Sequence, residues 1–259
     1  MFCRMLVLLF FPSLFTQFSV AQGIVDQAAK PSVDKTGLQV ENARRPRSGG
    51  VPDAQISIAR LRVPRKARRL YEDAVSAMLG HDPRKAQRSL ERALKIDPQF
   101  PEALTLNACI QGTRRDWDSA EHNLQVAIQT DPGYAPAYVV LAGVYNAQSR
   151  FDDARRAAQQ AVLAGSIGWS LQYEIARSFI GKGQYERALA VSDDALRSDH
   201  GPLIHLAKAH ALLGLLRYAP AVDELREFLH DQPSGDGSQE ARDLLQHVMA
   251  INARNPHSE

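Results

Sequence analysis

Histidine and aspartate are the residues of this 259-residue sequence best suited to chemistry, because they bind metal ions and transfer protons. Of the eight histidines, His200, His205 and His210 follow one another at intervals of five residues. On a helix such side chains diverge by about 140°, so they would not converge on one ion. The adjacent pairs Asp152-Asp153 and Asp193-Asp194 also point to different sides of a helix, which is typical of a solvated face.

The familiar catalytic and cofactor motifs are absent from the sequence. It contains no His-Glu-x-x-His, no Gly-x-Ser-x-Gly, no glycine-rich phosphate loop and no EF-hand loop. Its two cysteines, Cys3 and Cys109, are too few for a disulfide-rich scaffold or a cysteine-built zinc site. We therefore expect a chain that is not an enzyme and holds no metal or cofactor. A catalyst built on helix termini is the less favoured alternative.

Residues 1–21 have the pattern of a secretory signal peptide. Arg4 precedes the apolar run Met5–Phe15, and Ser19 and Ala21 are small residues at −3 and −1 of a cleavage site. The run is shorter than the ~20 apolar residues that span a membrane. We predict a cleaved signal peptide and a periplasmic or secreted protein, with a retained membrane anchor as the alternative. Cys109 would then be the one cysteine of the mature chain, and we expect it to be buried and inert.

Residues 22–66 lack helical periodicity. Prolines, glycines and polar residues dominate residues 22–53, which we interpret as a flexible linker. Short apolar alternations in residues 54–66 suggest an extended basic strap that ends next to the first helix.

Alanine recurs with a fixed period through residues 67–234. Two series each have spacings of 34, 34, 34 and 33 residues, a third ends in Phe228, and an aromatic residue recurs in four units. Ten alanines in ten equivalent positions indicate an array of equal units. The series are Ala74, Ala108, Ala142, Ala176 and Ala209; Ala86, Ala120, Ala154, Ala188 and Ala221; Ala93, Ala127, Ala161 and Ala195; and Trp117, Phe151, Tyr185 and Tyr218.

Each unit contains two helical patterns. In the second unit, Trp117, Ala120, Leu124 and Ala127 mark one stripe of a helix, and Asp116 is placed to cap its start. A small residue at each helix crossing lets two antiparallel backbones approach closely. One helix pair cannot bury its own apolar face, so each unit needs the next one.

This pattern resembles the tetratricopeptide repeat family, whose repeats have small residues at positions 8, 20 and 27, an aromatic residue at 17 and proline at 32. Asp82-Pro83 stands near the first turn in place of an aromatic residue, and Ser166 and His200 replace closing prolines. The resemblance implies an all-α, right-handed α-solenoid of helix-turn-helix repeats with a C-terminal capping helix. The expected units are 67–100, 101–134, 135–168, 169–201 and 202–234, followed by a capping helix and tail over 235–259.

In this family, one stripe of the first helices lines a concave groove that binds peptides. The resemblance therefore implies a non-catalytic adaptor or scaffold for a protein or peptide in the cell envelope. The alternative is an accessory subunit of cell-envelope assembly or polysaccharide export. For Tyr71, Tyr173 and Leu206, packing against neighbouring units is the competing role. The implied groove residues are Tyr71, Val75, Met78, Thr105, Cys109, Val139, Asn146, Tyr173, Arg177, Leu206 and His210.

Charge is unevenly distributed along the sequence. The formal net charge of the whole chain is only +2, which excludes a nucleic-acid binder that is basic over its whole surface. Residues 44–70 nevertheless hold nine basic side chains and one acid. For the basic collar Arg65, Lys66, Arg68 and Arg69, solvation or self-association with the acidic repeats is the favoured interpretation. Binding to an anionic membrane surface, to an acidic partner or, least favoured, to nucleic acid is the alternative.

Overall fold

Eleven α-helices and no strands make up the part of the chain that the computed structural model describes, which is residues 62–254 without 199, 200 and 236. The predicted signal peptide, the linker and most of the strap lie outside these residues. The helices are α4 (Arg65–Leu79), α5 (Pro83–Ile96), α6 (Pro101–Thr113), α7 (Trp117–Thr130), α8 (Ala135–Ala147), α9 (Phe151–Leu163), α10 (Trp169–Gly181), α11 (Tyr185–Ser198), α12 (Pro202–Gly214), α13 (Tyr218–Asp231) and α14 (Ser238–Arg254).

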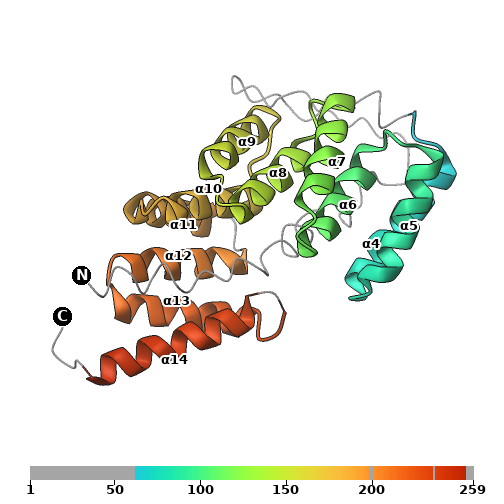
Figure 1. Ribbon diagram of the computed structural model, residues 1–259. Helices are drawn as coiled ribbons and strands as arrows, with labels where there is room; N and C mark the ends of the chain where they lie inside the picture. Colours follow the sequence, from blue (N-terminus) through green and yellow to red (C-terminus); the bar gives the residue numbers. More distant parts are fainter. Residues whose placement is uncertain (1–61, 199–200, 236, 255–259) are drawn as a thin grey trace, which may run out of the picture.

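The helices form an all-α solenoid of consecutive pairs (Figure 1). The pairs are α4/α5, α6/α7, α8/α9, α10/α11 and α12/α13, and α14 packs against α13 at the end of the series. The first helices also pack on one another, α6 on α8, α8 on α10 and α10 on α12. We call these first helices, α4, α6, α8, α10 and α12, the inner row.

Helix α4 begins earlier than expected. The strap prediction made residues 54–66 extended, but Arg65 and Lys66 belong to the first turn of α4. Pro64, with φ −57° and ψ 138°, is extended and directly precedes α4, whereas Arg62 is helical. A proline lacks the backbone N–H that a helix start leaves unpaired, so a helix begins readily after it. The starts of α6, α8, α10 and α12 coincide with the predicted unit boundaries.

The periodic alanines lie at the contacts between helices. All ten members of the two complete series have no exposed surface, and the same holds for Ala93, Ala127, Ala161 and Ala195 of the third. Phe228 takes the equivalent place in the last pair and is also fully buried. Methyl-sized side chains here let the two backbones of a pair approach, as the sequence pattern predicts.

The turn inside each pair has the same backbone geometry. His81, Arg115, Ser149, Gly183 and Leu216 occupy equivalent places and all have positive φ, between 54° and 69°. Only glycine adopts this conformation without a steric cost, so four of the five turns keep a strained residue. The side chains of Asp82 and Asp116 cap the next helices by accepting hydrogen bonds from the backbone N–H groups of Lys85 and Ser119.

The recurring aromatic residue connects one pair to the next. A Cβ placed on Gly214 would overlap the ring of Tyr185, and one on Gly181 would overlap the ring of Phe151. The aromatic residue that begins a second helix therefore packs on the last residue of the following first helix. At Gly181 and Gly214 the close approach requires glycine, and such contacts make one pair depend on the next.

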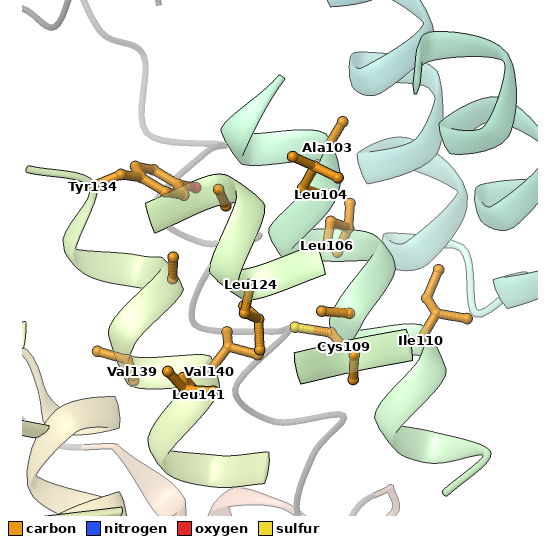
Figure 2. Close-up of a cluster of buried hydrophobic side chains, with 14 of the residues drawn as sticks. Ala103, Leu104, Leu106, Cys109, Ile110, Leu124, Tyr134, Val139, Val140 and Leu141 are labelled. Atoms are coloured by element: carbon orange, nitrogen blue, oxygen red, sulfur yellow. The ribbon is translucent and has the colours of Figure 1, made fainter. Parts of the chain in front are cut away.

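Buried side chains continue from one helix pair to the next. Figure 2 shows Cys109 of α6 turned toward Leu124 of α7 and Val140 of α8, all of them buried. At the C-terminal end, Ala241 and Val248 of α14 are buried, whereas its opposite face is exposed. Among the described residues, no helix combines the length and the apolar character that crossing a membrane would require.

Replacing Gly214 with Ala should destabilise the solenoid, because the added methyl group must displace the ring of Tyr185. We expect the free energy of unfolding to fall by about 1–3 kcal/mol, measured by urea denaturation. Gly168→Ala is the matched control, since a Cβ there meets no atom within 4 Å. Equal stability of the two variants would show that the aromatic residue does not connect the pairs.

Candidate functional site

Most of the predicted groove residues are buried. Arg177 and His210 keep partly exposed side chains, with 14% and 18% of their surface accessible. The other nine expose at most 9% of their surface, so they offer a ligand little area. For Tyr71, Tyr173 and Leu206 this burial supports packing between neighbouring units. The buried nine are Tyr71, Val75, Met78, Thr105, Cys109, Val139, Asn146, Tyr173 and Leu206.

The N-terminal half of the inner row is an apolar core. Tyr71 of α4 packs on Phe100, with ring centroids 5.3 Å apart. The hydroxyl of Thr105 donates a hydrogen bond of 2.8 Å to the carbonyl oxygen of Pro101, one turn earlier in α6. Its polar atom is therefore satisfied within its own helix, and the nearby groove residues Val75 and Met78 are buried apolar side chains.

The C-terminal half contains a buried polar cluster made by α8 and α10. The amide of Asn146 donates hydrogen bonds to Glu174, of 2.8 Å to the carboxylate and 2.9 Å to the backbone carbonyl. The hydroxyl of Ser178 lies 2.9 Å both from the Asn146 side-chain oxygen and from the Glu174 carbonyl. Asn146, Glu174 and Ser178 are all at most 5% exposed, so a polar network lies inside the inner row.

Arg177 neutralises the buried carboxylate of this cluster. Its guanidinium donates to both oxygens of Glu174, at 3.1 and 3.0 Å, and lies 5.5 Å from the centre of the Tyr173 ring. Burial alone would lower the pKa of Arg177, but the Glu174 carboxylate outweighs it and holds the pKa above its ordinary value. We call Asn146, Glu174, Arg177 and Ser178 the inner polar cluster.

Gly143 of α8 makes room for this carboxylate. A Cβ on Gly143 would stand 3.2 Å from the nearer oxygen of Glu174, which is tighter than ordinary van der Waals contact. Gly143 lies one turn before Asn146, so both residues of α8 present the same side to α10. A small residue and a hydrogen-bonding residue together form a fitted cradle for Glu174.

The two described histidines of α12 pair with different helices. His210 Nε2 lies 3.3 Å from a carboxylate oxygen of Glu240 in α14. Glu240 also contributes favourably to the charge of Arg177, so it couples the inner polar cluster to His210. Arg177 of α10, His210 of α12 and Glu240 of α14 are therefore linked through the Glu240 carboxylate, which pairs with His210 and acts electrostatically on Arg177. We call them the inner ionic edge.

His205 faces the other side of α12. Its Nδ1 lies 2.7 Å from Glu224 Oε2, and Lys208 Nζ lies 2.7 Å from Glu224 Oε1 and 2.9 Å from Asp193. Burial alone would raise the pKa of Glu224, but the hydrogen bonds from His205 and Lys208 outweigh it and hold the pKa below its ordinary value. This group joins α11, α12 and α13.

No cluster of three or more His, Cys, Asp or Glu side chains suited to a metal ion occurs among the described residues. His205 and His210 diverge on α12, as their spacing predicts, and each is held by a carboxylate. His200 lies outside the described residues. The basic collar residues Arg65, Lys66, Arg68 and Arg69 are exposed on the first turns of α4, at the opposite end of the solenoid from the inner ionic edge.

Glu174, Ser178 and Glu240 are site residues that the sequence interpretation missed. The repeat pattern assigns a role only to the positions of the predicted groove, which on α10 are Tyr173 and Arg177. Glu174 and Ser178 each lie one residue beyond these positions. A glutamate three residues before Arg177 in an inner helix was the available signal, because a buried carboxylate must be paired with a cation. Glu240 lies outside the repeats, so no repeat position could indicate it.

Removing the cation of the inner polar cluster should destabilise the folded protein. Arg177→Met leaves the Glu174 carboxylate buried without a counter-charge, and we expect the free energy of unfolding to fall by about 3–5 kcal/mol in urea denaturation. The double variant Glu174→Gln/Arg177→Met removes both charges and keeps a hydrogen-bonding side chain for Asn146. The double variant should recover more than half of the lost free energy of unfolding. If it recovers none, pairing of Arg177 with the Glu174 carboxylate is not the source of the stability.

The thiol of Cys109 should not react with disulfide reagents in the folded protein. Burial raises the pKa of its thiol to about 12, and only the thiolate reacts with disulfide reagents. We expect a disulfide reagent such as Ellman's to leave Cys109 unmodified at pH 8 until the protein is unfolded in denaturant. The Cys3→Ser background makes Cys109 the sole thiol of the chain. Rapid modification under native conditions would contradict the burial.

Comparison with known proteins agrees with this architecture. Residues 113–165 and residues 173–236 match family models of the tetratricopeptide repeat. No curated protein matches the chain significantly.

Several solved structures are similar in fold. TTC0263, a thermophilic tetratricopeptide repeat protein of Thermus thermophilus, is 22% identical, with 71% of this chain and 99% of that chain covered and a TM-score of 0.63. PilW, a type IV pilus biogenesis factor, is 17% identical over 76% of this chain and 96% of its own, with a TM-score of 0.59. The Cut9–Hcn1 hetero-tetramer structure of APC/C is 18% identical over 74% of this chain and 38% of that one, with a TM-score of 0.66.

At these identities, the structures are evidence of fold alone. The two matched segments and the helix pairs packed in series together show that the chain is a tetratricopeptide repeat protein, with the fold of a protein-interaction scaffold.

Proposed function

We propose that this protein is a non-catalytic adaptor that holds a protein or peptide at the inner ionic edge. The observation that carries the proposal is the partly exposed His210–Glu240 pair between α12 and α14, whose carboxylate also acts electrostatically on the partly exposed Arg177 of α10. The other predicted groove residues are buried, so Arg177 and His210 are the members of the predicted groove that keep accessible polar groups. A bound polypeptide would exchange hydrogen bonds with this edge.

The inner polar cluster would act as support for that contact. Glu174 fixes the guanidinium of Arg177 through two hydrogen bonds, and Asn146 and Ser178 fix Glu174. A side chain held in this way loses little rotamer freedom when a ligand binds, which favours affinity. Arg177 would therefore present the same donors to a partner each time, which is how a rigid scaffold recognises a defined sequence.

The cell envelope is the compartment that we propose. The predicted signal peptide supports it, and the pilus biogenesis factor PilW is one of the proteins with a similar fold. An accessory role in envelope assembly is the second candidate function, favoured by the same similarity. Both functions would use the inner ionic edge to hold another polypeptide.

Removing His210 and Glu240 together should abolish partner capture without leaving an unpaired charge. We expect affinity purification of His210→Ala/Glu240→Ala from native envelope extract to recover at least about tenfold less of each specific partner, quantified by mass spectrometry. The matched control is Asp223→Ala/Arg226→Ala, which removes an exposed ion pair of α13. Circular dichroism checks that both variants are folded. Equal recovery by both would refute binding at this edge.

A further inference from the structure

The first helix pair is strongly basic, whereas the remainder of the chain is acidic. Residues 62–96 contain ten Lys and Arg side chains and four Asp and Glu side chains, a net charge of +6. Residues 97–259 contain 14 basic and 21 acidic side chains, a net charge of −7. The near-neutral total therefore conceals a molecule with one positive end, and Figure 1 shows that α4 and α5 form one end of the solenoid.

Five of these basic side chains share one face of α5. At about 100° per residue, Arg84, Lys95, Arg88, Arg92 and Lys85 fall within an arc of about 100° on the helix surface. All five are exposed, and the buried residues Ala86, Leu90 and Ala93 lie on the opposite side. Glu91 is the one acid near this arc, and its carboxylate accepts a hydrogen bond of 3.0 Å from Gln87. We call these five residues the α5 basic face.

The α5 basic face lacks an acidic partner within the described part of the chain. None of its five residues forms an ion pair there with an oxygen at 4.0 Å or closer. By contrast, basic residues farther along are paired, such as Arg155 and Lys182 with Asp152 and Lys208 with Glu224. Charge that a fold leaves unpaired and concentrated is available to attract an external anion.

The collar on α4 extends this surface. Because α4 and α5 are joined by a short turn and pack together, the end of α5 at Lys95 lies beside the start of α4, with exposed Arg65, Lys66 and Arg69. Ile96, which is 37% exposed, follows Lys95 at the same end. Ile96 is therefore an exposed apolar residue at the end of the pair that carries Lys95 and the α4 collar.

We infer that the α5 basic face and the α4 collar dock this protein on an anionic phospholipid bilayer. A bilayer presents a plane of phosphate groups and needs no pocket, which suits cations spread along about 16 Å of one convex helix. The acidic remainder is repelled by the same plane, so the protein approaches with its first helix pair. Ile96 reaches the interface between headgroups and acyl chains. The inference does not depend on the inner ionic edge.

An acidic protein is the competing occupant, including the acidic remainder of a second copy. Protein partners that form stable complexes bury a central cluster of large apolar or aromatic side chains. The exposed side of α5 carries only Ile96 of that kind, at its end. Its regular cationic face therefore favours an extended anionic surface over a protein interface.

Co-sedimentation of the full chain with vesicles tests this inference. Vesicles of phosphatidylcholine with about one third phosphatidylglycerol measure total binding, and phosphatidylcholine alone measures any binding by apolar segments. We expect charge-dependent binding at about 0.05 M salt that is largely lost at about 0.5 M. Arg84→Gln/Arg88→Gln/Arg92→Gln/Lys95→Gln should weaken the phosphatidylglycerol-dependent part at least about tenfold.

The matched variant removes the same charge elsewhere. Arg114, Arg115, Arg187 and Arg217 are exposed and lie outside the first helix pair, so changing these four to Gln leaves the α5 basic face intact. This variant should bind vesicles within about twofold of the unmodified chain. Equal losses in the two variants would show an effect of net charge alone and overturn the inference. So would unchanged vesicle binding with a loss of low-salt self-association in light scattering, because the occupant would then be a second copy.

Discussion

Close approach of paired helices at methyl-sized side chains is the constraint on which this structure depends. Every alanine of the two complete series is fully buried, and so are four of the third. A larger side chain at any of these crossings would separate two backbones and shift every later pair, because each pair packs only on its neighbours. Close approach also governs the contacts between pairs. At Gly181 and Gly214, the absence of a side chain leaves room for the aromatic ring of the preceding pair.

This close packing also determines where recognition can occur. An inner row packed so tightly buries the side chains that a looser array would expose, as Val139 and Leu206 illustrate. Polar groups inside such a row must satisfy one another, which the inner polar cluster does with hydrogen bonds from Asn146, Arg177 and Ser178. Within the predicted groove, the accessible polar side chains are then Arg177 and His210. Packing and recognition are thus consequences of the same spacing between helices.

The sequence predicts the architecture better than the site, for a physical reason. A 34-residue period fixes which residues face a neighbouring unit, and the starts of α6, α8, α10 and α12 follow from it. It does not fix how much of a residue remains exposed, which depends on the distance between first helices. The period therefore predicts a stripe of the inner row that includes Tyr71 and Tyr173, but it does not predict that both are buried. Glu174 was missed because its partners come from α8 and α10 together. The α5 basic face was missed because the repeat pattern specifies only the buried positions of a second helix. It carries no information about the residues on the solvent-exposed side.

The two candidate surfaces are independent of each other. The α5 basic face is on the first pair, and the inner ionic edge is on α10, α12 and α14, with the pairs α6/α7 and α8/α9 between them. In a solenoid with nearest-neighbour energetics, occupation of one end changes the free energy of the other end little. A partner at the inner ionic edge would therefore not have to displace a membrane at α5. The charge asymmetry supports this separation, since the anionic surface that attracts the first pair repels the acidic remainder and keeps the inner ionic edge away from it.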